Sequence, residues 1–400
     1  MHSLRELYKI GNGPSSSHTI APKKAALLFI NKYKECNFIR VTLYGSLALT
    51  GKGHLTDYII DKTLTEYNID HEIEFNYLDL PPHPNTMIFH GFKDNKEIVT
   101  KTILSIGGGS ISVLGEALEE IPTVYPHKYL FDIKSYIKEN NMTLKDYVYY
   151  FDKDIKSYLN LVLDTMVKAV NNGLKVDGTL HGDLKVRRKA KSIYEGIKDT
   201  DSEMFKAKRL ISAYAYAVAE ENAAGGEIVT APTCGAAGVL PACLMWVLNS
   251  NMYTKDEIID ALAVAGLFGN IVKFTASISG AEAGCQAEIG TACSMAAAFL
   301  ATLKGLDTES IEQASEIALE HHLGLTCDPI RGYVQIPCIE RNAVAALRAI
   351  DAADLAAMLD SKDSKISFDL VCKTMLDTGK DLVESYRETS IGGLARNYKI

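Results

Sequence analysis

The sequence lacks an excess of basic residues and lacks any apolar run long enough to cross a membrane. Lysine and arginine number 42 against 50 aspartates and glutamates, so the formal net charge is -8 and nucleic acid is not expected as a partner. The longest apolar stretch, 236–248, contains Pro241 and is shorter than the roughly 20 residues of a membrane-spanning helix. We therefore expect neither a nucleic acid nor a membrane as a partner.

Cysteine is also scarce, because eight residues are few for a disulfide-stabilised chain of 400 residues. Only Cys36 precedes residue 234, and the other seven lie in the C-terminal part of the chain. The first residues after Met1 show neither the charged nor the apolar region of a signal peptide. We therefore expect a cytoplasmic protein whose thiols are free or bound to a metal.

The residue pattern changes along the chain and predicts two domains, an N-terminal α+β sheet domain followed by a C-terminal all-α domain. Short β-rich runs and one helix lie within residues 1–150, and a charged stretch with helical periodicity, 151–204, is interpreted as connecting helices. Residues 205–400 are rich in Ala, Leu, Met and Gly, which favours helices. The expected strands are 39–44, 72–77, 86–90 and 99–104, and the expected helices include 22–34, 207–222, 255–268, 294–303 and 310–321.

A segment rich in hydroxyl groups, Gly-Asn-Gly-Pro-Ser-Ser-Ser-His-Thr, precedes the first expected helix. Ser15, Ser16 and Ser17 could hold a carboxylate or a phosphate near a helix N-terminus, but the same residues are equally typical of a helix N-cap. His18 adds a titratable group beside them and favours a functional role.

A second segment, 44–57, is rich in glycine and follows the first expected strand. Its glycines allow the backbone to approach a ligand, while Lys52 and His54 offer a cation and a general base. The segment matches neither a Walker A sequence nor a dinucleotide-binding fingerprint. A solvated turn explains Lys52 well and His54 less well.

Three cysteines lie among glycine, aspartate and proline rather than in apolar runs. Cys285 is flanked by Gly and Gln, Cys327 precedes Asp-Pro, and Cys338 follows Pro337. Proline beside a ligating thiolate is typical of iron–sulfur sites, because it fixes the loop and removes a competing N–H. No two cysteines have the C-x2-C spacing that a zinc site would favour. We expect four other thiols to pack in the core, Cys36, Cys243, Cys293 and Cys372, whereas the sequence leaves Cys234 open.

Taken together, these motifs resemble the bacterial iron–sulfur L-serine dehydratases, also called L-serine ammonia-lyases. The resemblance covers nearly the whole chain and implies a beta-type domain (1–150), a connector (151–204) and an alpha-type iron–sulfur domain (205–400), without a separate regulatory domain. The shared motifs, in order, are Ser-Ser-Ser-His-Thr, Tyr-Gly-Ser-Leu-Ala-x-Thr-Gly-Lys-Gly-His, Ser-Ile-Gly-Gly-Gly, Thr-Ala-Pro-Thr-x-Gly-Ala, Ser-Gly-Ala-Glu-x-Gly-Cys-Gln and Cys-Asp-Pro followed by Gln-Ile-Pro-Cys-Ile-Glu-Arg-Asn.

The resemblance also implies a [4Fe-4S] cluster on Cys285, Cys327 and Cys338, with one iron open to act as a Lewis acid on L-serine. A histidine base would remove the Cα proton, with His54 the first choice and His18 the second. The implied products are pyruvate and ammonia, as in amino-acid degradation and gluconeogenesis. The active site is expected at the interface of the two domains, and the protein is expected to be a homodimer. The implied substrate-binding residues are Ser15, Ser16, Ser17, Ser46, Lys52 and Asn85.

Two positions depart from the family pattern. Some members end in a cysteine that reaches the open iron, whereas Cys372 is the last thiol here, so no ligand from the tail is expected. The usual asparagine of the Thr-Ala-Pro-Thr-x-Gly motif is Cys234. The alternatives are a related lyase that releases sulfide from L-cysteine and a non-catalytic iron–sulfur sensor. A pyridoxal-phosphate lyase is disfavoured, because no lysine lies in an evident cofactor motif.

Overall fold

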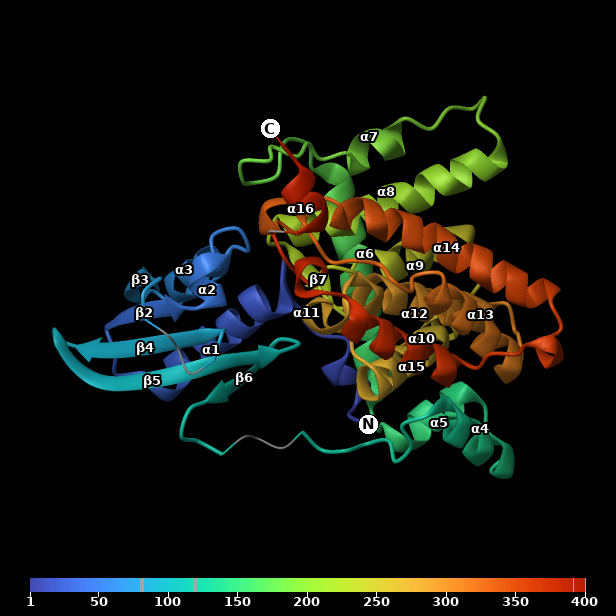
Figure 1. The fold of residues 1–400 in the computed structure, drawn as a ribbon, viewed down its shortest axis with the longest axis horizontal. Helices are drawn as coiled ribbons and strands as arrows, with labels where there is room; N and C mark the ends of the chain where they lie inside the picture. The colour runs from blue at the N-terminus through green and yellow to red at the C-terminus, as the bar shows by residue number, and fades with distance from the viewer. Residues whose placement is uncertain (80–82, 118–120, 391, 400) are drawn as a thin grey trace. The chain divides into compact units, whose positions relative to one another are not determined.

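The computed structural model shows two compact units, residues 11–120 and Met1–Ile10 together with Ile121–Ile400 (Figure 1). The N-terminal unit is built on a sheet and the other unit is mainly helical, which confirms the expected fold class. The boundaries at residues 150 and 204 stay predictions. The structure describes residues 1–79, 83–117, 121–390 and 392–399, so the terminal Ile400 lies outside the described residues.

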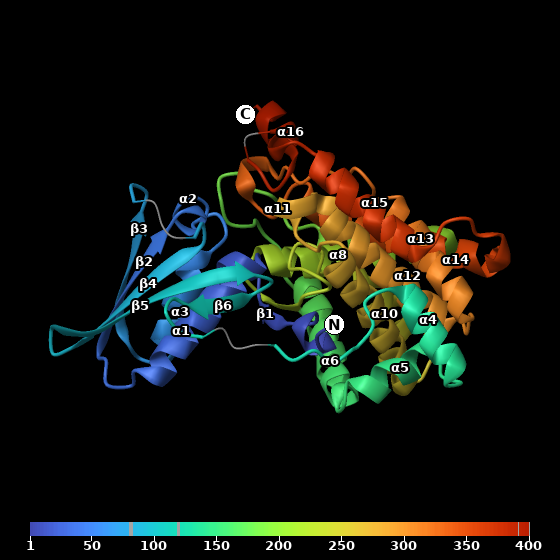
Figure 2. The ribbon, with the colours of Figure 1, turned by 60° about the horizontal axis from the view of Figure 1, so that its bottom comes forward.

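The sheet unit contains five strands in the order β3-β2-β4-β5-β6. β2 pairs with β3 in parallel, and the remaining neighbours are antiparallel. Ile39, Val41 and Leu43 alternate along β2 and are fully buried against α1 and α3, which cover one face of the sheet (Figure 2). The elements are α1 (Ala21–Lys32), β2 (Phe38–Tyr44), α2 (Ser46–Leu49), α3 (Thr56–Glu66), β3 (Asp70–Asn76), β4 (Thr86–Lys93), β5 (Lys96–Gly107) and β6 (Ser110–Val113).

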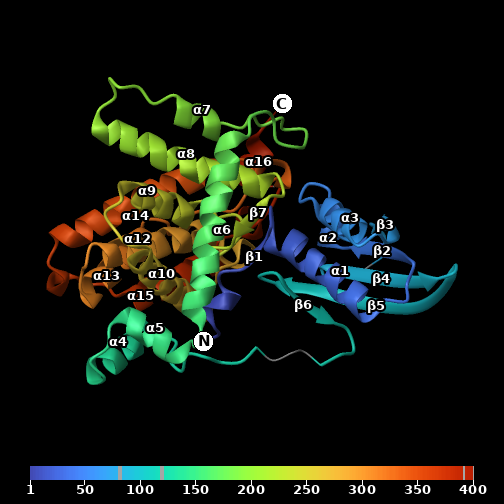
Figure 3. The same cartoon turned by 180° about the vertical axis from the view of Figure 1, so that it is seen from behind.

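The helical unit is organised around two long buried helices, α10 and α12, and α6 packs across α8, α9 and α10 (Figure 3). α10 begins with a capping box, in which Thr254 and Glu257 satisfy each other's backbone N–H groups. By length and composition α10 could cross a membrane, but 78% of its apolar window is buried inside the unit, as in a core helix. The longer helices are α6 (Ile155–Lys175), α8 (Glu203–Ala223), α9 (Val239–Ser250), α10 (Lys255–Thr275), α12 (Thr291–Leu303), α13 (Thr308–Glu320), α14 (Cys338–Met358) and α15 (Phe368–Asp381).

Shorter elements complete the two units. Short helices are α4 (Leu130–Glu139), α5 (Leu144–Phe151), α7 (Ala190–Glu195), α11 (Gly280–Ala283) and α16 (Gly393–Asn397), and the short strands are β1 (Ile10–Asn12) and β7 (Glu227–Val229). Turns of 3-10 helix lie at Leu4–Glu6, Ile330–Gly332, Ser361–Asp363 and Glu384–Tyr386, and π-helical turns lie at Ser16–Ile20 and Gln286–Gly290.

The first ten residues belong to the helical core, although the sequence pattern places them in the sheet domain. Leu4 and Tyr8 are fully buried beside α10, and the Tyr8 hydroxyl donates a hydrogen bond of 3.0 Å to the Leu262 carbonyl. Gly266 makes room for them, because a Cβ atom there would lie 2.8 Å from both side chains. The N-terminal segment therefore depends on a contact with residues more than 250 positions away.

Residues 121–150 also pack with the helical unit. Tyr149 on α5 donates a hydrogen bond of 2.7 Å to Asp260 on α10, and Lys145 forms an ion pair with the same carboxylate at 2.7 Å. α4 is linked in a similar way, because the N–H of Leu130 donates to Asp369 on α15 at 2.9 Å. Two carboxylates of the helical core, Asp260 and Asp369, thus hold a segment that the sequence pattern assigns to the sheet domain.

Candidate active site

The serine-rich segment forms a π-helical turn, Ser16–Ile20, that leads directly into α1. The Ser15 hydroxyl accepts the N–H of His18 at 3.3 Å, so Ser15 does cap this turn. The Ser17 carbonyl accepts a hydrogen bond of 2.9 Å from the Ser105 hydroxyl on β5. π-helical turns are rare and are often found at functional sites. N-capping and a functional role are therefore compatible in this segment.

His18 is buried and surrounded by hydroxyl groups. Its Nε2 lies 3.2 Å from the Ser46 hydroxyl and 3.0 Å from the Thr50 hydroxyl, and its Nδ1 lies 3.4 Å from the Ser15 hydroxyl. Burial, and then the neighbouring His54, lower the pKa of His18 to about 3. The ring is therefore neutral near pH 7 and is too weakly basic to serve well as a general base.

His54 stacks on His18, with ring centroids 4.5 Å apart and planes inclined by 29°. The Nδ1 of His54 lies 3.1 Å from the Thr50 carbonyl, which can only accept a hydrogen bond. Nδ1 therefore carries the proton of the neutral ring, and Nε2 carries the lone pair. This tautomer gives His54 a defined basic position.

Two more predicted residues lie near this pair in the sheet unit. The Ser46 N–H donates to the Pro84 carbonyl at 2.7 Å, and the next residue, Asn85, accepts the Ser105 N–H on its main-chain carbonyl at 2.9 Å. The Asn85 side-chain oxygen is buried and has no hydrogen-bond partner among the described residues. Such an unsatisfied buried acceptor calls for a ligand or another partner.

Lys52 lies apart from these hydrogen bonds. Its side chain is exposed, and its ammonium lies 5.2 Å from the centroid of the Phe75 ring on β3, within range of a cation–π interaction. The structure therefore brings together Ser15, Ser17, His18, Ser46, His54 and Asn85 within the sheet unit, with Ser16 at the start of the π-helical turn, and leaves Lys52 on an aromatic side chain.

The second candidate centre lies in the helical unit and is built from cysteines. Cys285 directly precedes the π-helical turn Gln286–Gly290, and Cys327 lies in the loop after α13. The thiol sulfurs of Cys285 and Cys327 and a carboxylate oxygen of Glu288 all lie within 4.8 Å of one another. Cys338 begins α14 and is the least buried of the three predicted thiols. This donor set could hold a metal.

Arg341 places a positive charge beside these thiols. A hydrogen bond with Cys327 and the Arg341 guanidinium lower the pKa of Cys285, whereas the pKa of Cys327 is raised by its hydrogen bond with Cys285 and by burial. Burial also raises the pKa of Cys338 well above its usual range. The protein alone thus favours the thiolate of Cys285. The thiols of Cys327 and Cys338 need the positive charge of a metal cation to lose their protons. The residues present fit a thiolate-bound metal group.

Buried amides hold the segments that carry the cysteines. The Gln286 side chain accepts the N–H of Gly324 at 2.9 Å and so links the Cys285 segment to the loop before Cys327. Asn342 accepts the N–H of Gly238 at 2.8 Å and donates to the carbonyl of Cys338 at 2.8 Å. Side chains of this kind orient metal ligands and set their geometry.

Residues near the C-terminus form hydrogen bonds with the Cys327 loop. The N–H of Cys327 donates to the Tyr386 carbonyl at 2.8 Å, and the Cys327 carbonyl accepts the N–H of Thr389 at 3.1 Å. The N–H of Leu394 donates to the Asp328 carboxylate at 2.7 Å. Tyr386, Thr389 and Leu394 therefore form part of the support of this loop.

The other five cysteines are all buried, outside the group around Cys285. The thiols of Cys243 and Cys293 point to carbonyls of α14, at 3.5 Å from Ala346 and 3.2 Å from Ala345 respectively. Burial raises the pKa of Cys243 to about 12 and also raises that of Cys293. Both behave as core side chains.

Sequence reasoning missed Glu288. The signal is its position three residues after Cys285, because residues three apart in a helical segment lie on the same side. A carboxylate between small and apolar residues, in Gln-Ala-Glu-Ile-Gly, was the second signal.

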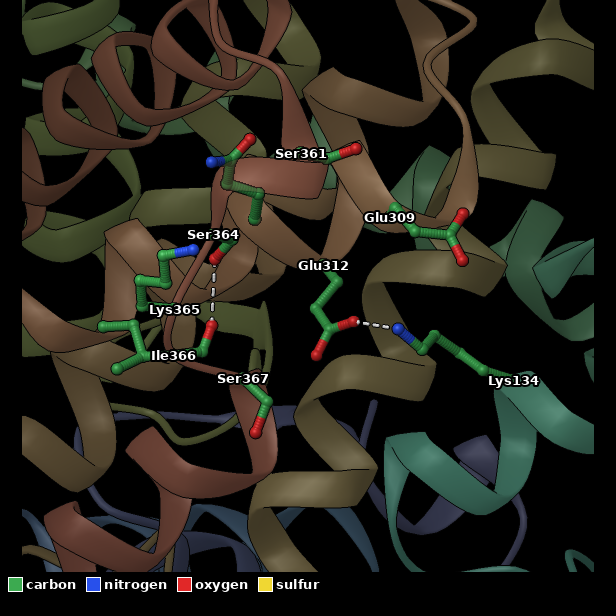
Figure 4. A pocket seen from close by; sticks show the side chains of 9 residues that line it. Lys134, Glu309, Glu312, Ser361, Ser364, Lys365, Ile366 and Ser367 are labelled. Atoms are coloured by element: carbon green, nitrogen blue, oxygen red, sulfur yellow. Dashed lines mark hydrogen bonds and ion pairs between the residues drawn. The ribbon is translucent and has the colours of Figure 1, made fainter.

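A separate pocket of about 230 Å³ contains none of the predicted residues (Figure 4). It is lined mainly by polar side chains, together with Ile366, from α4, α13 and the segment before α15. The ammonium of Lys134 pairs with Glu312 at 2.6 Å in this pocket. Gln313 also lines this pocket and is buried, and its carbonyl oxygen lacks a hydrogen-bond partner within the described part of the chain.

Comparison with known proteins identifies the family of the chain. The family model of the serine dehydratase alpha chain matches residues 62–395, and that of the beta chain matches residues 3–64. The chain belongs to the serine dehydratase family. It is a single-chain serine dehydratase in which the beta and alpha parts are fused, and it is a lyase. The two matches meet within α3, so they do not follow the two compact units.

This chain matches curated L-serine dehydratases over nearly its whole length. It is 37% identical to L-serine dehydratase 1 of Escherichia coli strain K12, over 99% of each chain. It is 38% identical to the L-serine dehydratase of Haemophilus influenzae, over 99% of each chain. It is also 38% identical to that of Streptomyces coelicolor, over 99% of this chain and 98% of the relative.

Proposed function

We propose that this chain is an L-serine ammonia-lyase, which eliminates water from L-serine and yields pyruvate and ammonia after hydrolysis of the resulting enamine. The observation that carries the proposal is the group formed by the buried Cys285 and Cys327 and the half-buried Glu288 beside Arg341, in a chain of the serine dehydratase family. Three thiols without a disulfide, of which one is favoured as a thiolate, suit a metal group rather than a structural cross-link.

Cys285, Cys327 and Cys338 would hold a [4Fe-4S] cluster. When bound, such a cluster supplies an iron without a protein thiolate, and this iron polarises the substrate hydroxyl as a Lewis acid. Arg341 favours the thiolate of Cys285, and Gln286 and Asn342 orient the segments on which the thiols lie. The chain's role here is to present the thiols and to keep them ordered.

His54 is proposed as the base that takes the Cα proton of serine on its Nε2. The Thr50 carbonyl supports this role, because it keeps the other ring proton on Nδ1. His18 is proposed to remain neutral and to orient the substrate and His54, since its pKa of about 3 makes it a poor proton acceptor near pH 7. The hydrogen bond at Nδ1 of His54 and the low pKa of His18 together favour His54 as the base.

The substrate's charged groups are proposed to bind to the hydroxyls and amides of the sheet unit. Asn85 offers a buried carbonyl oxygen, without a partner among the described residues, to the ammonium group. Ser15, Ser16, Ser17 and Ser46 would bind the carboxylate through hydroxyl and N–H groups at the start of α1 and α2, and Lys52 would supply the countercharge. A cytoplasmic location and a homodimer stay predictions.

The decisive experiment is an anaerobic assay with L-serine in which iron, acid-labile sulfide, pyruvate and ammonia are measured on one sample. We expect about four irons and four sulfides per chain and broad absorbance near roughly 400 nm that is lost in air together with activity. Sulfide release from L-cysteine without pyruvate from L-serine would favour the desulfidase alternative. Redox cycling without ammonia release would favour a sensor.

A further inference from the structure

Glu288 lies among the thiols without being one of the expected ligands. One of its oxygens shares the group in which Cys285 and Cys327 lie, with all ligand atoms within 4.8 Å. Its Oε2 is 4.0 Å from the Cys327 sulfur. The residue as a whole is half-buried. Its position is that of a metal-binding group.

The orientation of this carboxylate is fixed by its neighbours. The Thr233 hydroxyl donates a hydrogen bond of 2.7 Å to Oε1, which leaves Oε2 on the side of the cysteines. Gly280 lies directly against Oε2, because a Cβ atom there would be 2.7 Å from that oxygen and 3.1 Å from the Cys327 sulfur. A hydroxyl on one oxygen and a metal on the other is a common arrangement for a ligating carboxylate.

Within the described residues the Glu288 carboxylate forms no ion pair with lysine or arginine, and Arg341 acts on it without direct contact. Carboxylates enclosed among apolar and sulfur groups are normally paired or coordinate a metal. The Thr233 hydroxyl and the Cys327 thiol, at 4.0 Å, leave most of this requirement unmet.

We propose that the Glu288 carboxylate is a fourth protein ligand of the metal group held by Cys285, Cys327 and Cys338. It binds the iron that lacks a thiolate while substrate is absent, and the oxygen groups of L-serine replace it when substrate binds. This inference rests on the proposed function, since it requires the cluster.

The test compares Glu288→Gln with Glu282→Gln, in which the same change is made three residues before Cys285 instead of three residues after it. Glu282 is exposed, and its carboxylate accepts a hydrogen bond of 2.6 Å from Ser277 rather than facing the thiols. Each anaerobic enzyme is reduced in water enriched in oxygen-17, without substrate, and examined by electron–nuclear double resonance. We expect no oxygen-17 coupling from solvent in the unaltered enzyme or in Glu282→Gln, and a clear coupling in Glu288→Gln, because water then binds the iron.

Two outcomes would overturn the inference. One is a solvent oxygen-17 coupling in the unaltered, substrate-free enzyme, a measurement that needs no variant and so does not depend on how Glu288→Gln folds. The other is a Glu288→Gln enzyme with full iron and sulfide content and no new coupling. Failure of the proposed function itself would look different, since the unaltered enzyme would then contain no cluster iron and sulfide.

Discussion

The imidazole rings of His18 and His54 stack with their centroids 4.5 Å apart. A positive charge on one ring disfavours a charge on the other, and burial already lowers the pKa of His18 to about 3. His18 is therefore neutral near pH 7 and presents no charge to His54. The Thr50 carbonyl in turn lies 3.1 Å from the Nδ1 of His54.

We expect His54→Ala to lower kcat by about 10²–10⁴-fold while iron and sulfide content stay unchanged, because the loss of a base acts on the chemical step. His90→Ala is the matched control, since His90 lies on β4 and contacts Glu97 and Thr100 at the surface. A His54→Ala enzyme with the kcat of the His90→Ala enzyme would remove His54 from the role of base.

The neutral state of His18 makes stability depend on pH. Its pKa is about 3 in the folded protein and about 6.5 in the unfolded chain, so the unfolded state binds more protons between these values. The free energy of unfolding is therefore lowered as pH falls through this window, by up to about 1.4 kcal/mol per pH unit. Urea unfolding at pH 7 and pH 5 should show a loss of about 2 kcal/mol that is absent in His18→Gln. Equal pH dependence of the two proteins would contradict the neutral burial of this ring.

We expect alanine at Cys285, Cys327 or Cys338 to abolish iron binding and activity, because each removes one of three thiolates. Cys293→Ala should leave both nearly intact, since that thiol lies in the core against the Ala345 carbonyl. Iron content and pyruvate formation measured on the four variants check this division. The same loss in all four variants would mean that core thiols and ligands have been assigned wrongly.

Two glycines that face Glu288 give a steric test of the metal centre. Gly280→Ala would place a Cβ atom 2.7 Å from Glu288 Oε2 and 3.1 Å from the Cys327 sulfur, whereas Gly235→Ala would place one 3.5 Å from Oε1, an ordinary contact. We expect Gly280→Ala to lower metal affinity by about tenfold or more and Gly235→Ala to have little effect. Titration of iron binding under anaerobic conditions measures both, and similar affinities in the two variants would show that the carboxylate and thiol can move aside.

Local sequence patterns were enough to predict most of the helices and strands of the fold. The alternating residues of β2 have the period of a strand, and the apolar, alanine-rich run of α10 is too long for a strand and is typical of a buried helix; both elements are found. The placement of Leu4 and Tyr8 could not be read in this way. These two side chains occupy the space that Gly266 leaves by having no side chain. The sequence gives no local signal for a contact between residues so far apart along the chain.

The candidate sites were predictable to a similar degree. The histidines, the hydroxyls and the three thiols have recognisable neighbours, whereas Glu288 depends on the geometry of a π-helical turn, Gln286–Gly290. A turn of this kind forms again at Ser16–Ile20, around His18. Neither turn has a residue pattern of its own, because its extra residue is accommodated by the surrounding packing. Both candidate sites thus owe their local shape to tertiary structure.

Main-chain hydrogen bonds join Cys327 to Tyr386 and Thr389, and the N–H of Leu394 donates to Asp328. The order of the Cys327 loop therefore depends on residues that follow all three of the predicted ligand thiols in the sequence. A substitution that loosens the C-terminal segment would thus also loosen the Cys327 thiol, without altering any cysteine.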